Sequence, residues 1–396
     1  MKRLLKSRLK SRLKSRLLRA AAGPLAGLSL AGCSTHEYSP LSSPAPMTRW
    51  SVSTNPSPEV VALPSEATPV LGLDHVETGP PPPKVATNAP MPTPPPAPAF
   101  TFGRGWIPLR VFAEHCAPAA PVAMERSTAG GIVSYRIATR QGVARLTIGS
   151  RLAQWNGIIL WLGFAPQMIQ GEPYLHALDA EKTLLPLAEK FAARPLTERT
   201  VVLDPGHGGA DGGTRGARHQ LEKHYTLDWA LRTERWLTNA GWKVFLTRRR
   251  DADVPLADRV TFADRVHADL FISLHFNSTF PQTQASGIET YCLTPVGMPS
   301  TLVRGYADDE RAAFPNNAYD AANLAWAFRL HQSLITATGA HDDGVKRARF
   351  MGVLRYQNRP AILIEGGFLS NPHDATGIES SAHREVLARA VAEALK

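Results

Sequence analysis

The sequence predicts an α/β fold for its C-terminal half, with a mixed, mostly parallel sheet flanked by helices. A small α+β module and a disordered Pro-rich linker precede it. Strand and helix patterns alternate across 198–396, short strands with glycine turns fill much of 101–195, and residues 33–100 are rich in proline and poor in aromatic residues. We therefore divide the chain into these three parts and an N-terminal segment, 1–32.

The N-terminal segment 1–32 is typical of an export signal. It contains nine lysine and arginine residues and no acid, and it ends in an apolar run that is too short to span a bilayer. The final Leu30-Ala31-Gly32 precedes Cys33 in a pattern that resembles the lipobox of bacterial lipoproteins. The resemblance implies a lipoprotein-type signal peptide and a lipid on Cys33 that anchors the chain to a membrane. An ordinary secretory signal, with Cys33 incidental, is the alternative.

The basic composition does not indicate a nucleic-acid partner. The formal net charge is +10, but the nine basic residues of segment 1–32 account for most of it and leave about +1 for the rest of the chain. An exported protein of this kind is expected at the cell envelope, on a bacterial membrane and facing the periplasm or the wall. The sequence does not identify a regulatory protein partner.

The linker, 33–100, cannot form a hydrophobic core because it consists mainly of Pro, Ser, Thr, Ala and Val. Proline runs at 80–83 and 94–96 favour extended polyproline II structure. We expect a semi-rigid spacer that holds the following domains away from the lipid anchor. A PxxP ligand for a partner protein is the alternative interpretation.

The module at 101–195 is predicted from alternating runs at 132–137 and 144–148, which are typical of short strands, and from a helical pattern at 175–191. Phrases such as Ile107-Pro108-Leu109-Arg110 loosely resemble the copper-amine-oxidase N-terminal-like module of some envelope proteins. That resemblance implies no metal and no catalytic residue here. An unassigned accessory domain is the alternative.

Two cysteines remain after Cys33. Cys116 falls in the module and Cys292 in the next domain. We therefore expect buried free thiols and no disulfide.

The C-terminal domain, 198–396, alternates buried strands with amphipathic helices. Residues 200–203 form an apolar run that enters a glycine-rich turn, and 221–239 has the period of an amphipathic helix that ends at Gly241. The same criteria predict strands at 200–203, 243–246, 270–274, 288–293 and 361–364, and helices at 221–239, 256–267, 321–338 and 383–395. In sheets of this type, functional residues gather at the carboxyl ends of the strands.

Four ionisable residues lie where these elements begin or end: His207, Glu222, His275 and Glu365. Two imidazoles and one carboxylate match a catalytic zinc site, in which three protein ligands leave a fourth position for water. A remaining glutamate is then suited to activate that water. The pattern therefore indicates a candidate hydrolytic zinc site.

Each of these residues also has a structural explanation. The glycine-rich turn around His207 would suit a phosphate group, although it lacks the Lys-Ser/Thr pair of a phosphate-binding loop. His275 is equally compatible with a buried structural histidine, and Glu222 with a favourable charge at a helix N-terminus. Glu365 follows four apolar residues, where a carboxylate costs free energy unless it is paired, hydrogen-bonded or functional.

The phrases around these residues resemble the zinc-dependent N-acetylmuramoyl-L-alanine amidases of bacterial cell-wall turnover, the amidase-3 type. The resemblance implies Zn²⁺ held by His207, Glu222 and His275, with Glu365 as the catalytic carboxylate. It also implies a peptidoglycan substrate, hydrolysed at the amide bond between the lactyl group of N-acetylmuramic acid and L-alanine. The matching phrases are Val202-Leu203-Asp204-Pro205-Gly206-His207-Gly208-Gly209, Leu246-Thr247-Arg248, Asp269-Leu270-Phe271-Ile272-Ser273-Leu274-His275-Phe276-Asn277, Gly287-Ile288-Glu289-Thr290-Tyr291 and Ile364-Glu365-Gly366-Gly367-Phe368-Leu369-Ser370-Asn371.

Zinc chemistry accounts for these roles. A zinc ion lowers the pKa of its water to about 7, and a nearby glutamate takes the proton as the water attacks the amide carbonyl. We expect Glu365 to return that proton to the leaving amine, without an acyl-enzyme. We expect Asp204, Asn277 and Glu289 to support the site or to contact substrate, with a turn-capping role as the alternative for Asp204.

Two features depart from the family pattern. Ala263-Asp264 stands where relatives often have Ala-Asn, which we interpret as a surface or packing change, and an extra polar stretch occupies 295–320. Some family members have a regulatory segment nearby that occludes the zinc site, so a lid is one hypothesis. A zinc peptidase or deacetylase would use the same ligands, and a wall-binding lipoprotein with an inactive site is a further alternative.

Overall fold

The computed structural model describes residues 101–117, 124–189, 198–216, 218–303 and 308–396. The expected export signal, the lipobox at Cys33 and the proline-rich linker lie outside these ranges, as does the boundary between the module and the C-terminal domain. The division of the chain into domains stays a prediction. Within the described ranges, no helix is both long and apolar enough to cross a membrane.

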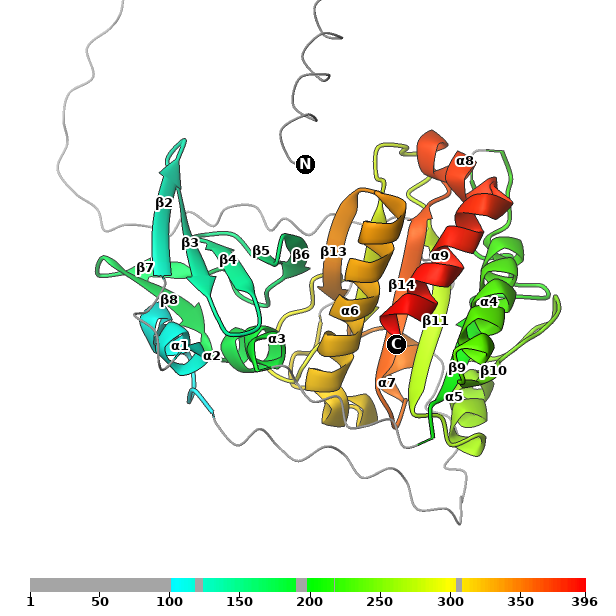
Figure 1. The fold of residues 1–396 in the computed structure, drawn as a ribbon, viewed down its shortest axis with the longest axis horizontal. Helices are drawn as coiled ribbons and strands as arrows, with labels where there is room; N and C mark the ends of the chain where they lie inside the picture. Colours follow the sequence, from blue (N-terminus) through cyan, green and yellow to red (C-terminus); the bar gives the residue numbers. More distant parts are fainter. Residues whose placement is uncertain (1–100, 118–123, 190–197, 217, 304–307) are drawn as a thin grey trace, which may run out of the picture. The chain divides into compact units, whose positions relative to one another are not determined.

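The C-terminal part of the chain forms a mixed, mostly parallel sheet (Figure 1). Its strands are β9 (Thr200–Pro205), β10 (Lys243–Leu246), β11 (Leu270–Asn277), β12 (Ile288–Cys292), β13 (Asp342–Arg347) and β14 (Ala361–Phe368). They lie in the order β10-β9-β11-β14-β12-β13, and each neighbouring pair is parallel except β14 with β12. The predicted α/β fold is confirmed.

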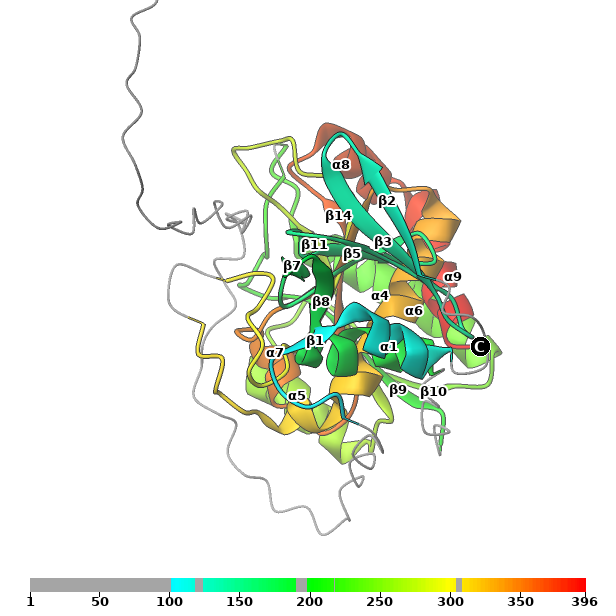
Figure 2. The same cartoon turned by 90° about the vertical axis from the view of Figure 1, so that its left-hand side faces the viewer.

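Helices pack against the sheet in two apolar cores. The helices are α4 (Glu222–Asn239), α5 (Leu256–Arg265), the 3₁₀ helix η2 (Pro315–Tyr319), α6 (Asp320–Thr338), α7 (Gly352–Arg355), α8 (Pro372–Glu379) and α9 (Ser381–Ala394). Successive strand residues point to opposite faces, so Leu203 joins one core with Trp229 of α4, whereas Val202 joins the other with Val353 of α7. Figures 1 and 2 show α9 packed against both α4 and α6.

The module before this domain is α+β, as predicted. Its elements are β1 (Trp106–Pro108), α1 (Leu109–Cys116), β2 (Met124–Ala129), β3 (Ile132–Ala138), β4 (Val143–Thr147), β5 (Leu152–Trp155), β6 (Ile158–Trp161), β7 (Gln167–Ile169), β8 (Glu172–His176), α2 (Ala177–Asp179), the π-helix η1 (Ala180–Leu184) and α3 (Leu185–Ala188). The helix expected at 175–191 begins later, because residues 172–176 pair with β1 and β7 as a strand. The helix α1 is absent from the sequence prediction.

Backbone and side-chain contacts join the module to the C-terminal sheet. β13 pairs with β6 at Val345 and Leu160, so the strand order continues through β6-β5-β4-β3-β2. Arg347 of β13 donates to the backbone carbonyl of Lys182 at 2.5 Å.

Both described cysteines agree with the sequence expectation. Cys116 and Cys292 are buried and free. Within the described ranges, no disulfide therefore contributes to stability.

Candidate active site

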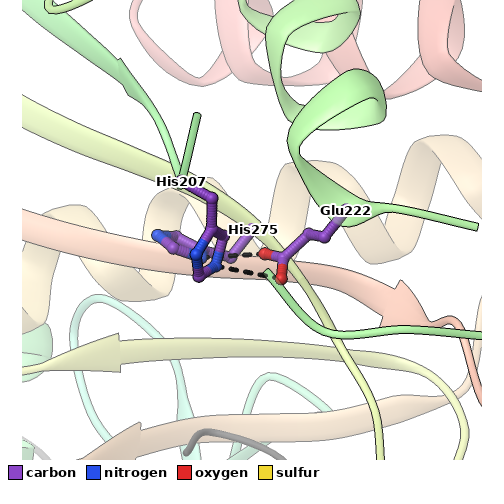
Figure 3. Close-up of side chains that lie close together, drawn as sticks. All are labelled: His207, Glu222 and His275. Carbon is purple, nitrogen blue, oxygen red and sulfur yellow. Dashed lines mark hydrogen bonds and ion pairs between the residues drawn. The ribbon is translucent and has the colours of Figure 1, made fainter. Parts of the chain in front are cut away.

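The structure brings three of the four predicted residues into one cluster (Figure 3). His207, Glu222 and His275 each offer a ligand-type atom, and these atoms all lie within 4.8 Å of one another. Glu222 bridges the two histidines, because its Oε2 lies 3.0 Å from His207 Nε2 and its Oε1 lies 2.9 Å from His275 Nδ1. All three side chains are nearly inaccessible to solvent.

Three separate elements place these side chains together. His207 follows β9, Glu222 is the first residue of α4, and His275 lies near the end of β11. Their close approach depends on glycine at two positions. A side chain at Gly206 would collide with the His275 ring, and a Cβ at Gly213, where φ is +72°, would lie 2.6 Å from Glu222 Oε2.

Hydrogen bonds on the outer side of each imidazole fix which nitrogen faces the cluster. His207 Nδ1 lies 2.7 Å from the acceptor Asp211 Oδ2, so Nδ1 carries the proton and Nε2 faces inward. His275 Nε2 lies 3.1 Å from Ser273 Oγ, which donates its own proton to Asp204 Oδ2 at 2.8 Å. His275 Nε2 is therefore a donor, and its Nδ1 is the nitrogen with a free lone pair.

The electrostatics of the cluster favour a cation. Burial opposes the charge on Glu222, but the neighbouring His207 and His275 hold the pKa of that carboxyl well below its usual range. Burial likewise opposes the charge on His207, yet Glu222 and Asp211 raise its pKa to about 10. A divalent cation between the three side chains would neutralise the Glu222 carboxylate in place of the protonated His207, which would then lose its extra proton.

The donor set also fits zinc. His207 Nε2 is buried and has no hydrogen-bond partner within the described ranges, although it lies 3.0 Å from Glu222. Two neutral imidazole nitrogens and one carboxylate oxygen are ligands that zinc takes in catalytic sites. The residues present are therefore suited to hold this ion.

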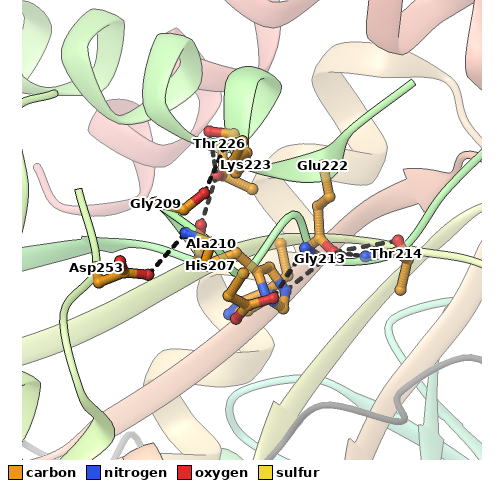
Figure 4. Close-up of polar contacts among 12 residues, drawn as sticks. His207, Gly209, Ala210, Gly213, Thr214, Glu222, Lys223, Thr226 and Asp253 are labelled. Atoms are coloured by element: carbon orange, nitrogen blue, oxygen red, sulfur yellow. Dashed lines mark hydrogen bonds and ion pairs between the residues drawn. The ribbon is translucent and has the colours of Figure 1, made fainter. Parts of the chain in front are cut away.

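The turn that carries His207 is held from two sides. Arg259 of α5 donates to the His207 carbonyl at 2.9 Å and to Asp204 Oδ1 at 2.6 Å. Figure 4 shows Lys223 of α4 on another side, where its Nζ donates to the Gly209 carbonyl at 2.7 Å. These contacts fix the backbone on both flanks of the histidine.

Glu365 lies beside the cluster on β14. It is in register with His275 of β11 on one side and with Glu289 of β12 on the other. Its side chain is fully buried, and neither oxygen has a hydrogen-bond partner in the described part of the chain. Burial, together with the charges of Glu222 and Glu289, raises the pKa of Glu365 well above its usual value. Such a shift brings a carboxyl closer to proton exchange at neutral pH.

Asn277 and Glu289 lie near Glu365 but do not line the adjoining cavity. Asn277 Nδ2 donates to Glu289 Oε2 at 2.7 Å, and Lys346 Nζ donates to Glu289 Oε1 at 2.5 Å. Both residues therefore belong to a buried polar network behind Glu365. Asp204, by contrast, lines the cavity and reaches His275 through Ser273.

A cavity of about 480 Å³ opens onto the cluster. Its lining comes from residues between 204 and 215, residues between 253 and 259, and His275, Met351, Val353, Leu363 and Glu365. No described residue of 295–320 is part of that lining. The lid hypothesis for this stretch has no support from the described residues.

Sequence reasoning did not single out Asp211 and Ser273. Ser273 stands two residues before His275 on a predicted strand. Because side chains alternate between the two faces of a strand, this spacing predicts that Ser273 and His275 share a face, so Ser273 could have been identified from the sequence. Asp211 lies in a turn where His207 and two following glycines have positive φ. No repeating pattern of residues in the sequence predicts where the side chains of such an irregular turn point.

Comparison with known proteins places the C-terminal domain in a family. Residues 201–396 match the family model Amidase_3, described as N-acetylmuramoyl-L-alanine amidase. The probable cell wall amidase LytH of Staphylococcus saprophyticus is 32% identical over 206 residues, which cover 52% of this chain and 60% of LytH. The N-acetylmuramoyl-L-alanine amidase AmiA of Escherichia coli is 30% identical over 217 residues, which cover 50% of this chain and 74% of AmiA.

A solved structure is also similar to about half of the chain. The catalytic domain of CwlV, an N-acetylmuramoyl-L-alanine amidase from Bacillus (Paenibacillus) polymyxa, is 29% identical, with a TM-score of 0.41 over 49% of this chain and 94% of that domain. The chain spans about 60% of the length of the staphylococcal relatives that it matches. The family model and the extended match to AmiA show that the chain belongs to the Amidase_3 family of N-acetylmuramoyl-L-alanine amidases.

Proposed function

We propose that this protein is a zinc-dependent peptidoglycan hydrolase. It cleaves the amide bond between the lactyl group of N-acetylmuramic acid and the L-alanine of the stem peptide. The observation that carries the proposal is the His207–Glu222–His275 cluster, with Glu365 beside it and a cavity in front, in a chain of the Amidase_3 family.

His207, Glu222 and His275 would hold the zinc ion through His207 Nε2, His275 Nδ1 and the Glu222 carboxylate. When bound, zinc lowers the pKa of water and polarises a carbonyl oxygen. Ser273 and Asp211 keep the outer nitrogens of the two imidazoles protonated, which leaves the inner nitrogens as ligands.

Glu365 is the general base and then the general acid. Its oxygens have no competing hydrogen bonds within the described ranges, so they are free to take a proton from the attacking water. The same carboxyl then donates the proton to the amine of L-alanine as it leaves. Its burial beside Glu222 and Glu289 favours the protonated form needed for that second step.

A covalent intermediate is not part of this mechanism. Among the described residues that line the cavity there is no serine and no cysteine. The Thr214 hydroxyl is engaged, since it lies 3.1 Å from Glu222 Oε2 and 2.9 Å from the Phe276 carbonyl. Water is therefore the nucleophile.

The cellular setting that we propose rests on the N-terminal sequence. An export signal with a lipidated Cys33 would anchor the protein to an envelope membrane, and the proline-rich linker at 33–100 would extend the catalytic domain toward the wall. Peptidoglycan is then within reach of a membrane-anchored enzyme.

Digestion of purified muropeptides tests the function, with mass spectrometry of the new termini. The expected products are a free lactyl carboxyl and a free L-alanine amine. Glu365→Gln should lower kcat about 10²- to 10⁴-fold while zinc content is retained, because it removes only the acid/base group. His275→Ala should lose the zinc itself. Release of D-alanine would instead show a peptidase, and release of acetate a deacetylase.

A further inference from the structure

One exposed cation, Arg215, lines the cavity. Two carboxylates that line it are paired: Asp204 with Arg259 at 2.6 Å, and Asp211 with His207 at 2.7 Å. Glu365 also lines it, but that side chain is buried and has no hydrogen-bond partner within the described ranges. The Arg215 side chain is exposed, and no residue in the described part of the chain forms an ion pair or hydrogen bond with its guanidinium.

The backbone of Arg215 is nevertheless fixed against the proposed zinc site. Its carbonyl accepts a hydrogen bond from Ser278 Oγ at 3.0 Å. The backbone of Arg215 also forms an isolated antiparallel β-bridge with Leu221. The preceding Thr214 donates its N–H to Glu222 Oε2 at 2.9 Å. Arg215 is therefore one residue removed from a direct contact with a proposed ligand, and these contacts hold its backbone beside the cluster.

Asp253 and Asp211 add negatively charged carboxylates to the lining of the same cavity. Asp253 accepts the Ala210 N–H at 2.8 Å (Figure 4), and Asp211 faces His207. An anionic group of a substrate would be repelled by these carboxylates and attracted by Arg215. A guanidinium binds a carboxylate through two parallel hydrogen bonds, which adds orientation to the attraction.

We propose that Arg215 binds the α-carboxylate of the second residue of the stem peptide, and this inference rests on the amidase function proposed above. That residue is a D-glutamate linked through its γ-carboxyl, so its α-carboxyl is either free or amidated. An extended residue spans about 3.3–3.6 Å, which places this group within about two residue lengths of the attacked carbonyl. An arginine side chain covers such a separation. Arg215 therefore selects stem peptides whose second residue carries the free acid.

Two soluble substrates test this selection directly. Both are N-acetylmuramoyl tripeptides with L-alanine and L-lysine at the first and third positions, and they differ only in a free α-carboxylate or a carboxamide on the D-glutamate. The zinc-loaded protein should cleave the free acid with a kcat/KM about tenfold higher, and the difference should lie mainly in KM because the contact is made before and during the reaction.

Substitutions at Arg215 should remove the difference. Arg215→Ala should lower kcat/KM about tenfold for the free acid and leave the carboxamide substrate nearly unchanged, so that the two values converge. Arg215→Lys should retain part of the preference, since it keeps the charge and loses the paired donors. The matched control is Arg218→Ala, because Arg218 pairs with Glu379 at 2.9 Å and does not line the cavity. It should keep the wild-type preference.

The outcomes separate this inference from the function on which it rests. Equal kcat/KM for both substrates in the wild-type protein, or an unchanged preference in Arg215→Ala, would overturn the role of Arg215 and leave the amidase function standing. Failure of the zinc-loaded wild-type protein to release L-alanyl peptide from either substrate would overturn both.

Discussion

At the residue scale, Ser273 links two parts of the proposed site. Its hydroxyl donates to Asp204 and accepts from His275 Nε2, so it fixes both the tautomer and the orientation of that imidazole. Ser273→Ala should weaken zinc binding about 10- to 100-fold, as is typical when the outer partner of a ligating histidine is lost. Competition with a chelator of known affinity measures this change.

The control for this prediction is Ser333→Ala. Ser333 also donates one hydrogen bond, to the Ala390 carbonyl at 2.7 Å, but it joins two helices and does not line the cavity. It should alter stability by about 1 kcal/mol and leave zinc affinity unchanged. Equal zinc affinity in the Ser273 variant and the wild type would mean that the hydroxyl does not position His275.

Residue type and position along the strands predicted where two of the candidate residues would lie, and their chemical roles stay predictions. His275 and Glu365 stand near the ends of apolar runs, where parallel strands bring them to one edge of the sheet. Their partners were harder to predict, because Asp211 acts from an irregular turn and Arg259 from a helix whose inward face also contains apolar residues. Tertiary packing, which no local pattern records, decides those contacts.

At the scale of elements, the pairing of α4 with α9 supports the helix that begins with Glu222. Asp228 of α4 accepts hydrogen bonds from Arg232 at 2.8 Å and from Arg384 of α9 at 2.5 Å. Burial opposes the charge on Asp228, but the two arginines hold its pKa below the ordinary value of 3.8. A carboxyl whose pKa is lowered in the folded state stabilises that state at pH values above its ordinary pKa. This stabilisation is lost as the pH falls through the pKa of the folded state.

Asp228→Asn should therefore lower the free energy of unfolding by about 1 kcal/mol at neutral pH, a modest amount because the carboxylate is partly exposed. The difference from wild type should shrink as the pH falls below the ordinary value of 3.8 and through the lower pKa of the folded state. Urea unfolding of the zinc-free protein across this range measures it. If the difference in unfolding free energy grew as the pH fell, the Asp228 carboxylate would not stabilise the folded state in this way.

Elements with a clear apolar run were predicted, whereas the mostly charged strand β13 was not. The strands β9, β11 and β14 each contain an apolar run of at least three residues. The strand β13 is mostly charged, which conceals it in the sequence. The charged side chains of β13 are accommodated in the sheet because they form ion pairs: Lys346 pairs with Glu289, and Asp342 pairs with His331 at 2.9 Å.

At the scale of the whole described structure, the stretch around Met298 connects the module to the C-terminal sheet. Arg151 of the module donates to the carbonyls of Pro299 and Ser300 at 3.3 and 3.2 Å. Met298 is fully buried and packs so closely on Gly163 that a Cβ there would overlap its side chain. We therefore interpret this part of the polar stretch as an internal connector.

Met298→Ala should lower the free energy of unfolding by about 2–5 kcal/mol, because it removes a fully buried side chain and leaves a cavity between the module and the sheet. Urea unfolding followed by tryptophan fluorescence and by far-ultraviolet circular dichroism should show coincident transitions that move together in the variant. The control is Met168→Ala on β7, where the side chain is 39% exposed and the loss should stay below about 1 kcal/mol. If the two variants lose equal stability, the segment around Met298 does not hold the module to the sheet.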